Sequence, residues 1–198
     1  IIGQQEETTT GMIGHSMLSI DKQFPPESGR FILLDGTPAD SLQAGYIPNL
    51  AKQLQCTVNK IEIREVNEAM QSLGTELSER MACGVGERET IFLIINALHR
   101  YRDLRRDEDD FGFSMGNEDK PKTPAQILTE VLKEGPPLGI HVIAATDTLA
   151  NLTRTFDRQS MREFDLRVLL QMGSNDSTNL IDAPNASKLG MHRALLYS

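Results

Sequence analysis

Residues 123–146 read TPAQILTEVLKEGPPLGIHVIAAT, and this stretch contains a complete helix followed at once by a complete strand. Thr123 before Pro124 is typical of a helix that begins with an N-cap and a proline at its first position. Gly135 and the two prolines after it end the helix. The apolar run at 139–146 predicts a buried strand. A helix joined closely to a buried strand is the unit from which α/β proteins are built.

The same alternation extends over the rest of the chain. Apolar runs, most of them continuous as in strands covered on both faces, predict further strands at 30–35, 58–63, 90–95, 166–172 and 193–197. Helical patterns occur at 44–55, 66–81 and 176–182 and after Gly11. The clearest has apolar residues three and four positions apart on one face, namely Val66, Ala69, Met70, Leu73, Leu77 and Met81. We therefore predict an α/β fold with a mainly parallel central sheet.

The composition is typical of a soluble globular protein, with 198 residues, 39% hydrophobic and 24% charged. We predict one domain, residues 1–198, without a membrane-spanning helix, because no apolar run approaches the ~20 residues that a span needs. The polar, acidic segment 105–122 reads as a surface loop. Because the chain starts inside a strand-like run, we expect it to be a fragment of a longer protein.

Charge and cysteine spacing exclude some functions. The net charge of −8 argues against a surface that binds nucleic acid over its whole extent. Cys56 and Cys83 lack the spacing of a zinc site, so we predict no metal ligands and reduced thiols in a cytoplasmic protein. Arginines at 100–106 could hold a nucleic-acid backbone or could form a solvated or inter-subunit face. Asp35 and Gly36, after the strand at 30–35, read as a turn.

The last third of the chain resembles a known family. GIHVIAAT at 139–146 is similar to the family run GIHLVLAT, and LRVLLQMGSNDSTNLIDAPNASKLGMHRALLY at 166–197 parallels TRIAFQV(S)S..DSRTILD..GA.KLLG.GDMLY. The chain resembles the RecA-like motor domain of the FtsK/SpoIIIE family, ring-forming DNA translocases that also include the motors of type VII secretion. The matching positions are Arg167, Gln171, Ser174, Ser177, Asp182, Ala186, Lys188 and Gly190.

The resemblance implies a three-layer RecA-like P-loop NTPase fold that uses ATP and Mg²⁺. It also implies partners, namely other FtsK/SpoIIIE-like domains or subunits in a ring or tandem array. DNA or a secreted protein would be the substrate of the assembly, in cell division or secretion. The domain itself would not insert into a membrane, although it could be the cytoplasmic part of a membrane-associated protein.

The first catalytic station is the Walker A loop, G-x-x-x-x-G-K-[ST]. In this sequence it corresponds to residues 3–10, with Gly11 following: Gly3, Gln4, Gln5, Glu6, Glu7, Thr8, Thr9 and Thr10. Thr9 replaces the lysine that bridges the β- and γ-phosphates. A carboxylate of Glu6 or Glu7 held ~4 Å from a phosphate oxygen would cost roughly 4 kcal/mol at an effective dielectric constant of ~20. The other interpretation is that these residues cap a helix, with Thr8 or Thr9 as N-cap.

The second station is the Walker B strand, which should end in Asp-Glu. Here the apolar run is followed by Asn96 and Ala97. Asparagine carries no charge for magnesium, and alanine cannot act as a base. A buried strand that simply leads into the next helix explains these residues equally well.

The third station, the sensor strand, ends in Thr146 and Asp147 in place of Thr-Gln. Asp147 could position water or a metal ion at the carboxyl end of a parallel strand, or it could cap the next helix. Arg167 is the candidate arginine finger for a neighbouring site, whereas Thr178 stands where the family run DSRTILD has arginine.

Losses at all three stations indicate a degenerate, hydrolysis-deficient domain with a structural or regulatory role in a translocase assembly. Binding of ATP and Mg²⁺ is then weak or absent. The alternative is an active ATP-dependent DNA or protein translocase whose catalytic groups are completed by neighbouring subunits or domains. A third possibility is a binding module without nucleotide that docks a partner through the former site.

Overall fold

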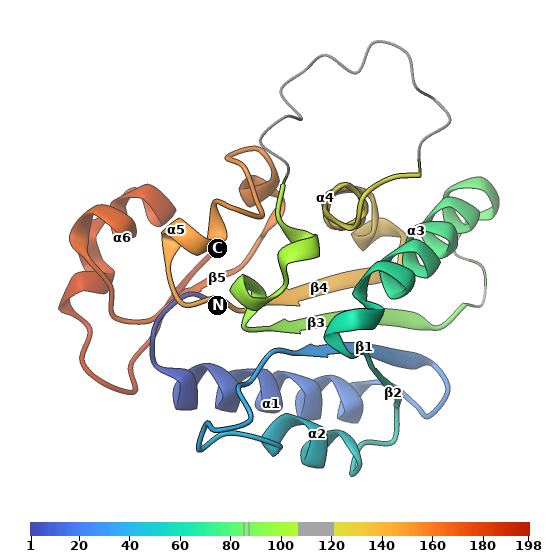
Figure 1. Cartoon of the computed structure of the whole chain (residues 1–198), viewed down its shortest axis with the longest axis horizontal. Helices are drawn as coiled ribbons and strands as arrows, with labels where there is room; N and C mark the ends of the chain where they lie inside the picture. The colour runs from blue at the N-terminus through green and yellow to red at the C-terminus, as the bar shows by residue number, and fades with distance from the viewer. Residues whose placement is uncertain (85, 87, 107–120) are drawn as a thin grey trace.

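The computed structural model describes residues 1–84, 86, 88–106 and 121–198. At its centre lies a four-stranded parallel sheet with the spatial order β2-β1-β3-β4 (Figure 1). Strands β5 and β6 form a separate antiparallel pair. The bounds are Gly29–Asp35 for β1, Thr57–Lys60 for β2, Thr90–Asn96 for β3, Ile140–Ala144 for β4, Arg167–Leu169 for β5 and Leu195–Tyr197 for β6. The predicted α/β class with a mainly parallel sheet is confirmed, although four strands are shorter than their apolar runs.

Helices cover both faces of the sheet (Figure 1). On one face lie α1 (Glu6–Gln23) and α2 (Tyr46–Ala51), and on the other lie α3 (Val66–Cys83) and α4 (Pro124–Glu134). Two shorter helices are α5 (Leu149–Leu152) and α6 (Ser174–Ile181). Short 3-10 turns are η1 Ile63–Glu65, η2 Leu98–Arg100, η3 Arg102–Leu104, η4 Pro136–Leu138, η5 Ser160–Glu163 and η6 Pro184–Lys188. The three-layer arrangement implied by the resemblance is therefore present.

Strand β3 shows why its sequence is apolar at every position. Ile91, Leu93 and Ile95 belong to the core shared with α3 and α4, whereas Phe92 and Ile94 belong to the core shared with α1. All five side chains are buried. Since burying such a side chain contributes ~1.5–3 kcal/mol, a strand covered on both faces gains from every residue.

The helix-to-strand stretch 123–146 folds as predicted. The Thr123 side chain accepts a hydrogen bond from the Gln126 backbone N–H (3.3 Å), and the Gln126 side chain accepts one from the Thr123 N–H (2.9 Å). This capping box, with Pro124 at the first helical position, begins α4. The helix ends at Glu134, and η4 leads the chain into β4.

The start of the chain joins the two sheets. Ile2 forms parallel bridges to Thr146, just after β4, and to Leu169 in β5. The Ile2 N–H donates to the Val168 carbonyl (2.8 Å), and the Ile2 carbonyl accepts from the Leu170 N–H (2.9 Å). Because Ile2 lies between β4 and β5, helix α1 begins at the carboxyl ends of the central strands.

Helix α1 begins at Glu6, earlier than the helix predicted after Gly11. Thr8 and Thr9 therefore lie inside the helix, and our assignment of either one as N-cap was wrong. The N-cap is Gln5, whose side chain makes no capping hydrogen bond within the described chain. Glu6 and Glu7 occupy the first turn, where carboxylates complement the positive end of the helix macrodipole.

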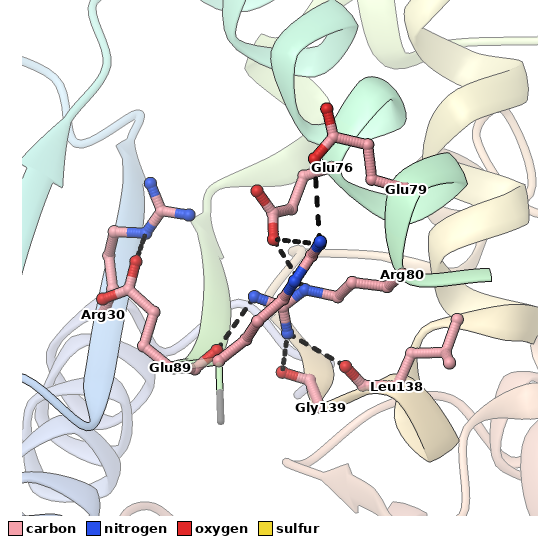
Figure 2. A network of polar contacts seen from close by, with 8 residues as sticks. Arg30, Glu76, Glu79, Arg80, Glu89, Leu138 and Gly139 are labelled. Carbon is pink, nitrogen blue, oxygen red and sulfur yellow. Dashed lines mark hydrogen bonds and ion pairs between the residues drawn. The ribbon is translucent and has the colours of Figure 1, made fainter. Parts of the chain in front are cut away.

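Helix α3 buries Arg80, whereas Met81 is 52% exposed, so the predicted place of Met81 on the buried face was wrong. The Arg80 side chain is only 1% exposed. Its guanidinium donates to Glu76 Oε1 (2.7 Å) and to the carbonyls of Leu138 and Glu89 (2.9 Å each). Figure 2 shows these contacts meeting around one guanidinium. Since the two carbonyls lie just before β4 and β3, Arg80 fastens α3 to the amino ends of both strands.

The predicted surface loop at 105–122 lies largely outside the described residues. At its beginning, Arg105 donates to the His99 carbonyl (2.7 Å), and Arg106 pairs with Asp157 (3.2 Å). Tyr101 is buried rather than available to stack on a base. Among the described helices, none has the length and apolar content needed to cross a membrane.

We predict that Arg80→Met lowers the free energy of unfolding by about 3 kcal/mol, because it leaves buried carbonyls without their donor and removes the nearer of the two arginines paired with Glu76. Urea denaturation measures this change. Arg88→Met is the matched control, since Arg88 lies 3.5 Å from the same carboxylate but has 34% of its side chain exposed. The control should cost less than about 1 kcal/mol. Equal losses in the two variants would contradict the role assigned to Arg80.

Candidate functional site

A cleft opens at the carboxyl ends of β1, β3 and β4, beside the first turns of α1. Its volume is about 650 Å³ including the open mouth. The fold brings residues from all three sequence-predicted stations together here, and the cleft is lined by Gly3, Gln4, Glu6, Thr9, Thr10, Thr37, Pro38, Asn96, Ala97, His99, Arg100, Ala145, Thr146 and Asp147.

Gly3 is the one Walker A glycine that the sequence retains at its expected place. Its φ is 152°, and a Cβ atom added to it would lie 2.4 Å from Leu170 Cβ. Its N–H donates to the Thr146 carbonyl (3.0 Å), which holds the backbone close to β4. Close packing therefore requires glycine at this position whether or not a phosphate binds.

We predict that Gly3→Ala destabilises the protein by about 2–3 kcal/mol, through overpacking against Leu170 and backbone strain. The free energy of unfolding in urea measures it. Gly11→Ala is the matched control, because Gly11 lies inside α1 and no described neighbouring atom comes within 4 Å of an added Cβ. The control should be stabilising by up to about 1 kcal/mol. A harmless Gly3→Ala would contradict the packing explanation.

Side chains of the protein itself hold the start of α1. Gln5 Oε1 accepts hydrogen bonds from the His192 backbone N–H (2.9 Å) and from the Thr8 hydroxyl (3.3 Å). Glu6 Oε1 accepts from the Ser41 hydroxyl (2.8 Å). Only residues 3–5 separate Ile2 from the helix, so the connection is shorter than the loop predicted at residues 3–10. Glu6, in the first turn, is one of the residues that line the cleft.

Thr9 and Thr10 lie on the cleft side of α1 and are 7% and 1% exposed. Neither side-chain oxygen has a hydrogen-bond partner among the described residues. A buried hydroxyl without a partner costs about 1–3 kcal/mol. Both hydroxyl oxygens are shut off from solvent, so this cost counts against the stability of the fold. We call these two residues the Thr9–Thr10 pair.

Asn96, at the expected magnesium position, is buried in a network with β1. Its Nδ2 donates to Asp35 Oδ1 (3.0 Å) and to the Thr37 hydroxyl oxygen (2.9 Å), and the Thr37 hydroxyl donates to Asp35 Oδ1 (2.6 Å). Ala97 follows with a φ of 54°, in the left-handed region. Sequence reasoning missed Asp35, which it read as part of a turn. The signal that could have found it is its place at the end of a strand that neighbours β3.

Asp147 binds Asn151 rather than capping α5. The two distances from Asn151 Nδ2 to the carboxylate oxygens are 2.8 and 3.0 Å, and His99 Nδ1 lies 3.5 Å from Oδ1. Thr148 is the N-cap of α5, so capping by Asp147 is ruled out. Burial alone would raise the pKa of Asp147, but the hydrogen bonds from Asn151 and Thr148 and the nearby His99 outweigh it and leave the pKa below its ordinary value.

We predict that Asn151→Ala raises the pKa of Asp147, because burial then acts against fewer hydrogen bonds. A carboxyl-carbon NMR titration measures it. A lowered folded-state pKa stabilises the protein above the unfolded value near ~3.9, and this stabilisation is lost as pH falls through the folded-state pKa. The stability difference between wild type and variant should therefore shrink in acid. Thr153→Ala, which removes only a hydroxyl bound to the Ala150 carbonyl, should leave the Asp147 titration unchanged.

Arg167, the candidate arginine finger, is engaged within its own chain. Its guanidinium donates to the carbonyls of Leu180 and Met161 and lies 5.8 Å from the centre of the Tyr197 ring. A role in a neighbouring site would require these contacts to break.

The residues of the cleft do not fit ATP with Mg²⁺. Thr9 brings no positive charge, Asn96 is neutral and directs its amide hydrogens at Asp35 and Thr37, and Ala97 has no base. Thr10 alone among these positions has a side chain suited to the magnesium shell. In the described part of the chain, no group of three or more His, Cys, Asp or Glu residues could hold a metal ion.

No protein-family model matches this chain, and no curated protein matches it. Solved structures do. The cytoplasmic domain of the Thermomonospora curvata type VII secretion ATPase EccC aligns over 100% of this chain with a TM-score of 0.62 and 14% identity. The chain has a RecA-like P-loop ATPase fold. EssC (ATPases 2 and 3) from Geobacillus thermodenitrificans aligns over 99% with a TM-score of 0.61 and 14% identity.

A third structure, T. curvata EccC (ATPases 2 and 3) in complex with a signal sequence peptide, aligns over 88% of the chain with a TM-score of 0.62 and 12% identity. This chain spans 24%, 36% and 30% of the lengths of the three matched chains. At these identities the likeness establishes the fold. It confirms, at that level, the resemblance to FtsK/SpoIIIE-type motor domains.

Proposed function

We propose that this chain is a hydrolysis-deficient RecA-like domain with a structural or regulatory role in a translocase assembly. The observation that carries the proposal is the network of Asn96 with Asp35 and Thr37. An aspartate carboxylate only accepts hydrogen bonds, so the NH₂ group of Asn96 must face it. The position expected to serve magnesium thus joins β3 to β1 instead.

Charge around the cleft supports the same proposal. Two carboxylates, those of Glu6 and Asp147, line it against one cation, the exposed Arg100, and no lysine stands at Thr9. A carboxylate ~4 Å from a phosphate oxygen costs roughly 4 kcal/mol at an effective dielectric constant of ~20. Such a penalty moves a micromolar affinity to about the millimolar range.

The domain would act beside intact motor domains in a longer, cytoplasmic protein. One matched structure is the cytoplasmic domain of a type VII secretion ATPase, and this chain spans 24%, 36% and 30% of the lengths of the three matched chains. We therefore favour a secretion assembly with a protein substrate over a DNA translocase in cell division. The neighbours in the array would be domains of the same fold.

An alternative is an active ATPase domain completed by neighbouring subunits. The Thr10 side chain at the position of the magnesium-binding hydroxyl favours it, since a cleft remains beside that residue. Turnover in the assembled protein would require another chain to supply a cation and a base.

We predict that calorimetric titration with ATP and Mg²⁺ gives a Kd weaker than about 1 mM and that phosphate release stays at background. Glu6→Gln should tighten binding, because it removes one carboxylate from the cleft. Glu68→Gln, an exposed carboxylate in the first turn of α3, is the matched control and should have no effect. Micromolar affinity together with turnover would overturn the proposed function in favour of the alternative.

A further inference from the structure

We propose that a surface rich in arginine, beside the cleft, binds an acidic segment of a partner protein. Two stretches far apart in the chain, residues 98–106 and 153–163, make this surface, which we call the arginine surface. Such binding goes beyond the proposed function, because it requires neither the loss nor the retention of ATP hydrolysis. Within these two described stretches the exposed arginines are Arg100, Arg102, Arg106, Arg154, Arg158 and Arg162.

The fold brings the two stretches of the arginine surface together. The Arg106 N–H donates to the Arg154 carbonyl (2.9 Å), and the Arg106 guanidinium lies 3.2 Å from the Asp157 carboxylate. The turns η3 and η5, one from each stretch, both pack against α4. Figure 1 shows the stretches next to each other, in yellow-green and orange. Arginines that are distant in the sequence therefore become neighbours.

Buried side chains fix the backbone that carries these arginines. Leu98, Tyr101 and Leu104 are buried at every third position, which is the period of 3-10 turns. Phe156 anchors the second stretch in the core in the same way. The arginines lie between these anchors and are exposed. A partner would therefore meet positive groups on a backbone that is already ordered, which lowers the entropic cost of binding.

Most of the charge on the arginine surface is not neutralised within the chain. The two stretches carry three acidic residues, namely Asp103, Asp157 and Glu163, against seven arginines. Among the described residues Arg106 alone of the exposed arginines pairs with a carboxylate, and Arg105 donates to a carbonyl. This local excess of positive charge belongs to a chain whose net charge is −8. Repulsion among the like charges would be relieved by a bound anion.

The cations are all arginine, which favours a protein as the source of that anion. Neither stretch contains a lysine, although lysine occurs elsewhere in the chain, as at Lys52 and Lys188. Arginine is enriched and lysine depleted at protein–protein interfaces. A guanidinium can also hold a carboxylate through two parallel hydrogen bonds. Glutamate or aspartate side chains on a partner segment fit this surface.

Two features disfavour a nucleic acid at the same surface. Duplex DNA carries one negative charge per ~1.7 Å of its axis, so the interspersed carboxylates of Asp103 and Glu163 would face phosphates. A peptide can instead place its own carboxylates away from them. The aromatic side chains of the two stretches, Tyr101 and Phe156, are buried and give no platform on which bases could stack.

The test measures, by fluorescence anisotropy, how the whole chain binds a labelled dodecapeptide of alternating glutamate and serine. We expect saturable binding that weakens as salt is raised and is at least about tenfold tighter than binding of the counterpart with glutamine for glutamate. Single-stranded oligothymidylate of the same length and phosphatidylserine vesicles are compared at the same salt concentration. Equal binding of the two peptides, or tighter binding of the oligonucleotide or the vesicles, would overturn the proposal.

Variants from both stretches show whether they form one surface. Arg102→Gln and Arg158→Gln should each weaken peptide binding by about threefold or more, and the double variant by about the product of the two factors. Arg64→Gln, in η1, is the matched control, because the Arg64 side chain is 85% exposed and lies outside the arginine surface. Loss of binding from one stretch alone, or an equal loss in the control, would overturn the proposal.

A variant that should gain affinity completes the test. Asp103→Asn removes a carboxylate from the arginine surface and should tighten peptide binding by about twofold or more. Asp40→Asn, which removes an exposed carboxylate elsewhere, should leave binding unchanged. Unchanged or weaker binding by Asp103→Asn would contradict the role of charge. ATP turnover would overturn the proposed function and leave the arginine surface standing, whereas failure of the glutamate peptide to bind would do the reverse.

Discussion

The position of the cleft depends on the backbone hydrogen bonds of Ile2. By pairing with Val168 and Leu170 on one side and bridging Thr146 on the other, Ile2 places the chain between β4 and β5. Gly3 follows, in a space too narrow for a side chain, and α1 then runs beneath the sheet. A parallel strand in this position delivers a helix N-terminus to the carboxyl edge, where open α/β sheets place their ligands.

The two ends of the sheet use polar side chains differently. At the amino ends, the Arg80 guanidinium meets carbonyls and Glu76, so a buried charge is fully used in holding α3 to the strands. At the carboxyl ends, Asn96 is similarly satisfied by Asp35, but the buried hydroxyls of the Thr9–Thr10 pair have no partner among the described residues. The polar groups are therefore fully paired at the amino ends and incompletely paired at the carboxyl ends, beside the cleft.

The elements predicted from the sequence differ from the structure mainly where a contact comes from a distant segment. Periodicity predicted α3 but placed Met81 in the core. The pattern could not show that Arg80 would be buried instead, because one of its carbonyl acceptors, Leu138, lies 58 residues away in the chain. The early start of α1 was missed because glutamate and threonine in a first turn read equally well as a loop. Asp35 and His99 were missed as site residues because each looked ordinary within its own segment.

The sequence by itself determined the order of helices and strands, since local periodicity and capping are encoded within a few neighbouring residues. It also determined that Thr9, Asn96 and Ala97 cannot supply the charge and the base that hydrolysis needs, because those properties belong to the side chains themselves. Only the tertiary structure decided that Asn96 faces Asp35, that Arg167 binds carbonyls of its own chain and that Thr9 and Thr10 line the same cleft as Asp147. These contacts join segments far apart in the chain, and their geometry exists only once the sheet has packed.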